Sequence, residues 1–191
     1  MANFGLSFPT IAKFNVETGK YSDVLKCGSA INTSVTPNYN EASLFADNRQ
    51  KESVKEFKNA NVELGVDTVP TRAVELLLGH KIEEDGTEIS HTDDSGSYVG
   101  YGFITEEIFN GIKRYRACLL TKVKFNESAE NYKTKGDSIE FGTPVLSGIS
   151  TSNDEGVWRI KSPYFDSEAE CDEWILRKLL GEKPTDQEIT A

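Results

Sequence analysis

The 191-residue sequence is poor in the residues that build reactive sites. It has two histidines, one methionine and three cysteines, and Cys27, Cys118 and Cys171 lie far apart in the chain. An odd number of widely separated cysteines fits buried free thiols in a reducing compartment better than a disulfide framework or a zinc site. The sequence therefore predicts no disulfide-stabilised secreted fold and no cysteine-based metal centre.

Long apolar runs and excess positive charge are also missing. No stretch approaches the roughly 18 apolar residues that a membrane span requires, so we expect no membrane partner. Residues 1–9 lack the basic start and apolar stretch of a signal peptide, which predicts synthesis and assembly in the cytoplasm. The 21 basic residues against 31 acidic ones give a net charge of −10. This balance disfavours a tight grip on nucleic-acid phosphates.

The candidate catalytic groups form no recognisable motif. His80 and His91, with Asp93 and Asp94, raise the hypothesis of a metal site, and His91 with the two aspartates raises that of a hydrolase. The spacing of these residues matches no ligand pattern. The acidic run 83–88 lacks the alternation of a calcium loop, and the glycine-rich run 96–102 lacks the helix and lysine of a phosphate-binding loop. We therefore predict a protein that is not an enzyme, with no catalytic residue, metal or cofactor.

Most of the chain is expected to form short strands joined by tight turns. Hairpins are indicated around Gly19, Asp85-Gly86 and Asn110-Gly111, because asparagine, aspartate and glycine tolerate the positive φ of two-residue type I′ turns. The strands expected beside these turns are 12–16, 21–25, 81–83, 87–89, 98–109 and 112–125. Further strands are expected at 30–36, 61–69, 139–150 and 157–161. Within 114–125, alternation predicts that Leu119, Thr121, Val123 and Phe125 share one face.

Two helices interrupt the strands. Residues 71–78 follow Pro70 and precede Gly79, which predicts a short helix with a left-handed stop. A longer C-terminal helix is expected to start at a capping box, Ser167 to Glu170, and to end at Gly181. Its apolar stripe is Cys171, Trp174, Ile175 and Leu179. Residues 182–191 are polar and are expected to form a flexible tail after a single domain at 1–181.

Residues 41–59 allow two interpretations. Propensity alone permits a polar helix, yet Val54 and Phe57 do not continue any 3.6-residue stripe from Leu44 and Phe45. A long exposed hairpin is equally allowed. The fold class predicted from these patterns is α+β and β-rich, with a short helix, a C-terminal helix and a long connecting hairpin if the second interpretation holds.

Several blocks of the chain resemble major tail proteins of phages with long non-contractile tails that infect Gram-positive bacteria. Five blocks occur in the same order: residues 35–48 (VTPNYNEASLFADN), 57–67 (FKNANVELGVD), 76–80 (LLLGH), 98–103 (YVGYGF) and 132–144 (YKTKGDSIEFGTP). The resemblance implies a β-sandwich or barrel-like domain with a flanking helix. It also implies a structural virion protein whose subunits form rings, usually of six, that stack into the tail tube.

The resemblance implies partners and a candidate interface as well. The partners are further copies of the chain and other tail proteins, namely the tape measure, tail terminator and distal tail proteins, while DNA passes through the bore without specific binding. We expect residues 41–69 to contain a hairpin that reaches a neighbouring subunit. Its expected apolar anchors are Leu44, Phe45, Val54 and Phe57. The protein would then reside in the virion tail, after assembly in the host cytoplasm.

Two other functions remain open at this point. A tail-like bacteriocin derived from a phage uses the same tube subunit, so the sequence does not separate it from a phage tail protein. A carbohydrate-binding β-sandwich belongs to a different class and would present exposed aromatic side chains on a platform.

Overall fold

The computed structural model describes residues 2–109, 111–128, 134 and 142–181. The expected polar tail at 182–191, the asparagine of the Asn110-Gly111 turn and most of the 132–144 block lie outside the described residues. The division into a domain at 1–181 and a tail stays a prediction.

Within the described residues the protein is mostly antiparallel β-sheet with two helices, which confirms the β-rich α+β class. The main sheet has the order β2-β1-β7-β8-β9-β4-β3, with β10 also paired to β8, and β5 and β6 form a separate small sheet. The strands are β1 (Ala2–Phe14), β2 (Tyr21–Lys26), β3 (Ala30–Ala46), β4 (Arg49–Val66), β5 (Lys81–Ile82), β6 (Glu88–Ile89), β7 (Val99–Phe109), β8 (Ile112–Asn126), β9 (Val145–Thr151) and β10 (Arg159–Lys161). The helices are α1 (Thr71–Leu78) and α2 (Glu168–Leu180).

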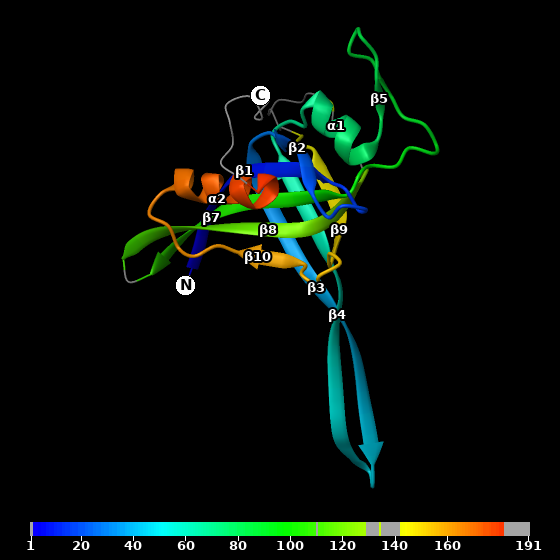
Figure 1. Cartoon of the computed structure of the whole chain (residues 1–191), viewed down its shortest axis with the longest axis vertical. Helices are drawn as coiled ribbons and strands as arrows, with labels where there is room; N and C mark the ends of the chain where they lie inside the picture. The colour runs from blue at the N-terminus through cyan, green and yellow to red at the C-terminus, as the bar shows by residue number, and fades with distance from the viewer. Residues whose placement is uncertain (1, 110, 129–133, 135–141, 182–191) are drawn as a thin grey trace.

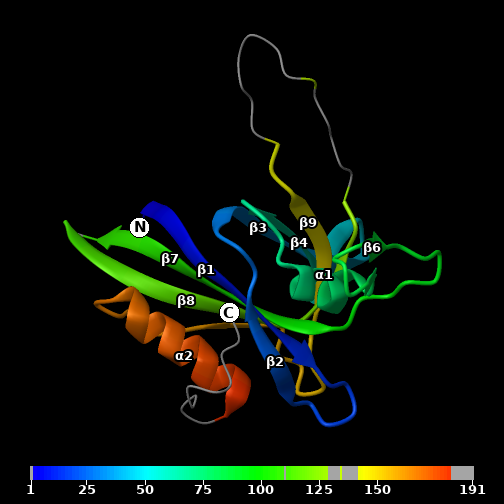
Figure 2. The ribbon, with the colours of Figure 1, turned by 90° about the horizontal axis from the view of Figure 1, so that it is seen from above.

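The sheet curls around a core that receives side chains from the strands at both ends of the sheet. Ile11 and Leu25 from β1 and β2 share one buried cluster with Leu64 of β4. Across this core the Tyr101 hydroxyl donates a hydrogen bond to Thr33 Oγ1 on β3, at 3.0 Å. Ala73 and Leu77 of α1 belong to the same cluster, so α1 covers the core from one side, as Figures 1 and 2 show.

Helix α2 covers the opposite face of the sheet. Cys171, Ile175, Leu176 and Leu179 pack with Ala12, Ile104 and Leu119 from β1, β7 and β8 in a second buried cluster. Gly102 permits this contact, because a Cβ there would lie 2.8 Å from Ile175 Cγ2. The sheet is therefore buried on both faces at its centre, which is why β8 reads as a nearly continuous apolar run from Ala117 to Thr121.

The helix boundaries follow the sequence prediction closely. The Ser167 side chain accepts a hydrogen bond from the Glu170 backbone and the Glu170 side chain binds the Ser167 backbone, so the capping box is confirmed. Gly181 at φ 79° and Gly79 at φ 82° end α2 and α1 in the left-handed conformation, as predicted.

The predicted face pattern of β8 is wrong. Leu119 packs in the cluster beneath α2, whereas Val123 and Phe125 belong to the core on the other side of the sheet. The register explains the difference, because Tyr101 pairs with Leu120 but Val99 pairs with Val123, so β8 holds an extra residue between them. Such a bulge reverses the alternation of side chains on either side of it.

One turn also differs from the prediction. Gly86 has the expected positive φ of 86°, but Asp85 is not among the residues with positive φ, so this turn is not type I′. The Gly86 backbone N–H donates to Glu83 O, and the Glu83 N–H donates to Thr87 O. This pattern is the three-residue loop in which a tight turn is followed by a left-handed glycine.

Candidate assembly interface

The distal part of the β3–β4 hairpin leaves the body of the protein. β4 pairs with β9 only as far as Ala60, which lies opposite Ser150. Beyond that point β3 and β4 continue as a two-stranded ribbon, here called the arm and defined as residues 39–57. Figure 1 shows the arm standing clear of the body, in cyan and blue-green below the curled sheet. Residues 41–59 are therefore two strands joined by a turn at 47–48, and not a helix.

The arm is exposed on both of its faces. Apart from Ala46 at the tip and Phe57 at the base, every arm residue assigned to a strand is exposed. The ladder runs from Tyr39 opposite Phe57 to Ala46 opposite Arg49. Its contacts are local: Lys55 Nζ lies 2.5 Å from Glu41 Oε1 and 4.7 Å from the Tyr39 ring centroid. The pairing raises the pKa of Lys55, chiefly through the hydrogen bond to Glu41.

The tip of the arm is a two-residue turn that the sequence interpretation missed. Asp47 and Asn48 have φ of 53° and 59°, and they connect the paired residues Ala46 and Arg49. Two consecutive residues of positive φ in a two-residue loop identify a type I′ turn, which aspartate and asparagine tolerate. The signal that could have fixed the hairpin was therefore Asp47-Asn48.

The four predicted anchors occupy three environments. Leu44 and Val54 lie on one face of the arm, since Leu44 follows Ala42 by two residues and Ala42 pairs with Val54. Phe45 lies on the other face and is the most exposed of the four at 66%, against 58% for Leu44 and 53% for Val54. These three side chains are free of the body.

Phe57 is the exception, because it contacts the body. Its ring stacks on Trp158, with centroids 4.5 Å apart and planes at 13°, and it meets Tyr39 edge to face at 6.2 Å. Phe57 is only half-buried, but it joins the base of the arm to the segment before β10. Leu44 and Val54 thus lie together on one face of the arm, Phe45 lies on the other face, and Phe57 lies at the base of the arm.

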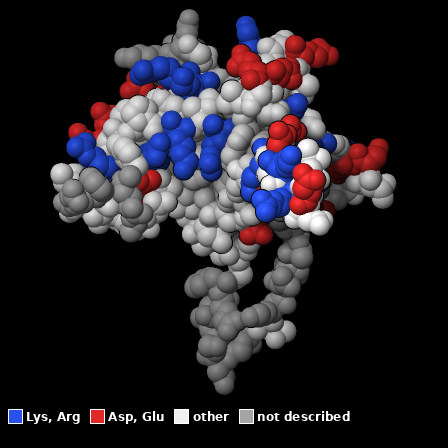
Figure 3. Space-filling view, turned by 90° about the horizontal axis from the view of Figure 1, so that it is seen from below, with Lys and Arg blue, Asp and Glu red and all other residues white. Residues whose placement is uncertain are grey.

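Both signs of charge are interspersed on the arm. Arg49, Lys51 and Lys55 alternate along β4 with Glu52 and Glu56. In the view from below, with the arm toward the viewer, basic and acidic side chains lie together on it (Figure 3). The arm has no single-sign field, so its exposed apolar side chains are the feature that distinguishes it.

The weak catalytic candidates are not assembled into a site. The backbone N–H of His91 donates to Asp94 Oδ2 at 2.7 Å, and His91 and Asp93 are exposed. His80 is 6% exposed, and its Nδ1 lies 2.6 Å from Glu88 Oε1. Among the described residues, no group of three or more His, Cys, Asp or Glu side chains is arranged to hold a metal ion.

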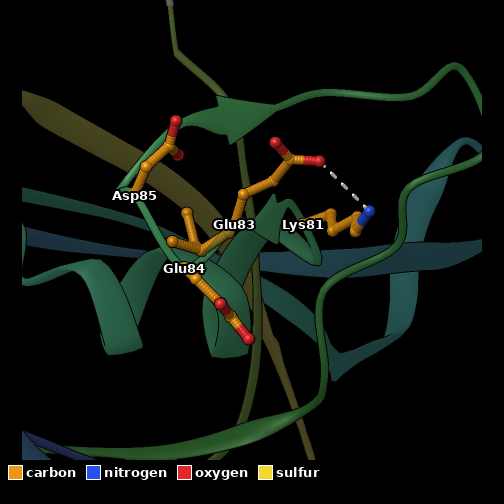
Figure 4. Close-up of a pocket in the computed structure, with 5 residues that line it drawn as sticks. Lys81, Glu83, Glu84 and Asp85 are labelled. Atoms are coloured by element: carbon orange, nitrogen blue, oxygen red, sulfur yellow. Dashed lines mark hydrogen bonds and ion pairs between the residues drawn. The ribbon is translucent and has the colours of Figure 1, made fainter.

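The hollows in the described part of the protein are shallow. One lies at the β5–β6 turn and is lined by Lys81, Ile82, Glu83, Glu84 and Asp85. Figure 4 shows the four polar side chains of this lining pointing away from one another, with one contact between Lys81 and Glu83, whose Nζ and Oε1 atoms are 3.4 Å apart. The pKa of Asp85 is lowered by hydrogen bonds from Thr87. The arrangement is that of a solvated turn.

The three cysteines are free and buried, as the sequence predicts. Burial raises the pKa of the Cys27 thiol to about 12 and that of Cys171 to about 11. Burial also raises the pKa of Cys118. Thiols with raised pKa values are weak nucleophiles at neutral pH, so these side chains behave as small apolar core residues.

Exposed aromatic rings are distributed over several elements. Phe4 and Phe8 lie on β1, Tyr39 and Phe45 on the arm, and Tyr164 follows β10. Four of these rings lie beneath a cation: Lys113 over Phe4, Lys26 over Phe8, Lys55 over Tyr39 and Arg116 over Tyr164.

Comparison with protein-family models and with curated proteins finds no match for this chain. None of the helices in the described residues has the length and apolar character needed to cross a membrane.

Proposed function

We propose that the protein is a structural, non-enzymatic subunit that assembles with copies of itself, and specifically the major tail-tube subunit of a long-tailed phage. The observation that carries the proposal is the arm, a ribbon that leaves the body and is exposed on both faces. The five ordered sequence blocks described above support the more specific proposal of a tail-tube subunit. A tail-like bacteriocin built on the same tube is included, because the subunit is the same part there.

The physical argument starts from the stability of the arm. An isolated two-stranded hairpin is marginally stable in water unless a further strand or a packed face supports it. Leu44, Phe45 and Val54 are nonetheless more than half exposed on this ribbon. Apolar side chains in that position contribute to stability only when another surface covers them. A neighbouring subunit is the surface that a tube supplies.

The arm also has the reach that such a contact requires. From Tyr39 to Ala46, β3 continues for eight residues beyond the body, which at about 3.3 Å per residue is roughly 26 Å. A ring of identical subunits uses heterologous contacts, in which one surface of each copy meets a different surface of the next. An arm that projects from one side of the body is suited to that geometry.

The charge of the subunit is compatible with a conduit for DNA. Six copies carrying −10 each would sum to about −60, and acidic groups along a bore repel phosphate. We propose that DNA passes through the assembled tube without specific binding. The tape measure, tail terminator and distal tail proteins are the further proposed partners.

Excision of the arm tests the proposal. Residues 41–55 are removed and Asn40 is joined to Glu56, its ladder partner, through an inserted Asn-Gly turn. The removed residues pair with one another, and Lys55 also lies over the ring of the retained Tyr39 at the base of the arm, so the free energy of unfolding of the body should stay within about 0.5 kcal/mol of the parent value. Concentrated parent protein should form rings or tubes in negative-stain electron microscopy, and the excised variant should not.

A point variant separates the anchors from the length of the arm. Leu44→Ser with Phe45→Ser keeps the ribbon but removes two exposed apolar side chains, and it should also reduce assembly. The matched control is Val16→Ser, which removes an apolar side chain that is 46% exposed outside the arm. Tubes formed by the excised variant, or a parent protein that remains free of rings and tubes and binds oligosaccharides, would contradict the proposal.

A further inference from the structure

The main sheet has free edges that differ in how they are protected. β2 ends the sheet on one side, and there Asp23 has a φ of 50° and the register with β1 shifts between Ile11 and Lys13. The short β10 carries Arg159 and Lys161 and is followed by Pro163. Charged side chains, irregularities and proline are the devices that stop an edge strand from pairing with another chain.

In the arm the free edge of β3 carries one of these devices, the charged side chain of Glu41, because the register shifts of the ladder place their extra residues, Lys51 and Lys58, in β4. β3 is 17 residues long, and Glu41 is its one charged residue. Pro37 marks the point at which the strand enters the arm, and no proline, lysine or arginine follows it up to Ala46. Within the described residues β3 pairs only with β4. An edge of this composition is open to a further strand.

The other strand of the arm has the opposite character. Residues 49–58 of β4 contain six charged side chains, Arg49, Lys51, Glu52, Lys55, Glu56 and Lys58. β4 therefore has the sequence of a protected edge strand, whereas β3 has the sequence of an interior strand.

We propose that the β3 edges of two copies of this chain pair antiparallel and form a four-stranded sheet in the order β4-β3-β3-β4. The occupant of the edge is a second copy, because β3 is the strand of the described main sheet with a long edge that carries one charged side chain, and two such edges complete each other. Both outer strands of the resulting sheet are then the charged β4. The assembly is closed, as an isologous contact requires.

The side chains select the register with Ala42 opposite Ala42 of the second copy. Ala42 pairs with Val54 within one copy, so this register forms an apolar row of Val54, Ala42, Ala42 and Val54 across four strands. On the other face it sets Tyr39 opposite Phe45 of the second copy, an aromatic cross-strand pair that occurs twice. A shift by two residues would set Glu41 against Glu41, which is unfavourable.

This pairing has a consequence for assembly that rests on the proposed tube function. An isologous contact closes after two copies, whereas tube contacts continue from subunit to subunit. An arm that is paired in the dimer cannot contact the next subunit of a tube. Dimerisation would therefore keep subunits from joining a growing tube. Pairing of residues 39–45 with the same residues of the second copy involves seven residues per strand, which is a small interface of the transient kind, so self-association is expected in the micromolar range.

Engineered cysteines test the pairing and its register. In Ala42→Cys the two thiols of a dimer lie on directly opposed residues about 4.5–5.5 Å apart at Cα, within disulfide reach. In Val54→Cys, at the same level of the ribbon, the two residues are three strand spacings or about 14 Å apart. The native cysteines are all buried, so the introduced thiol is the accessible one.

Under mild oxidation at micromolar concentration, A42C should form a disulfide-linked dimer on a non-reducing gel and V54C should stay monomeric. Ala42→Lys, which opposes two cations in the dimer, should shift sedimentation-velocity profiles to the monomer, whereas Val54→Lys should not. Equal crosslinking of A42C and V54C, or a parent protein that sediments as monomer across 1–100 μM, would overturn the pairing. Both experiments are read on dimers and not on tubes, so they decide the pairing separately from the proposed function.

Discussion

Truncation of Phe57 should lower the stability of the protein, whereas truncation of Phe45 in the same arm should reduce assembly. Phe57 is half-buried and stacks on Trp158 at 4.5 Å, whereas Phe45 is 66% exposed and distant from the body. A fully buried phenylalanine costs about 3–5 kcal/mol when changed to alanine. Half of that burial predicts about 2 kcal/mol for Phe57→Ala. Phe45→Ala should change the free energy of unfolding by no more than about 0.5 kcal/mol.

Urea unfolding followed by far-UV circular dichroism measures both values, and this signal does not depend on the tryptophan next to Phe57. The two variants remove the same atoms from the same ribbon, so each is the control for the other. Assembly should give the reverse order: Phe45→Ala reduces the yield of rings and tubes, although its body is as stable as the parent.

The stacking contribution can be isolated by a double-mutant cycle. Stacked aromatic pairs contribute about 0.5–1.5 kcal/mol beyond the area they bury, so Phe57→Ala and Trp158→Ala should show a coupling of that size. Equal destabilisation by Phe57→Ala and Phe45→Ala, or a coupling near zero, would refute the assignment of Phe57 to the base of the arm.

Two further predictions concern the body. Ser167→Ala removes the capping box of α2 and should lower the free energy of unfolding by about 1 kcal/mol in urea titrations, with Ser152→Ala as an exchange outside any helix cap. Asp67 has a lowered pKa because the Ser29 backbone N–H donates to it. This contribution is present above the unfolded pKa of about 3.9 and is lost as pH falls through the lower folded value. Parent protein should therefore lose more stability than Asp67→Asn between pH 5 and pH 2, and parallel losses would contradict the role of this hydrogen bond.

The parts of the fold that the sequence predicted correctly have local causes. α2 is specified by Ser167, Glu170 and Gly181, which act within one turn of the helix ends. α1 ends at Gly79, whose φ is 82°. Short-range hydrogen bonds and left-handed glycines depend little on the rest of the protein, so their signals can be read directly from the residues.

The parts that were missed depend on partners elsewhere in the chain. Leu119 and Val123 lie on opposite faces because β8 bulges between its pairs with Tyr101 and Val99. The local preferences of residues 119–123 do not predict this bulge, because it depends on the register against β7 and on the side chains that pack on the two faces of the sheet. The environment of Phe57 was likewise set by Trp158, which is distant in sequence.

The arm carries apolar side chains on both faces although both faces are exposed. A strand that is apolar on alternating positions buries one face, and a strand that is apolar on consecutive positions buries both. Leu44 and Phe45 are consecutive, so the tip of β3 carries apolar side chains on both faces, and both are exposed in the single chain. These residues lie beyond the main sheet, because the ladder between β4 and β9 ends at Ala60. We therefore propose that the burial for which this strand is suited comes from another copy of the chain, and that it comes from the side of β3, whose edge carries Glu41 as its one charged residue.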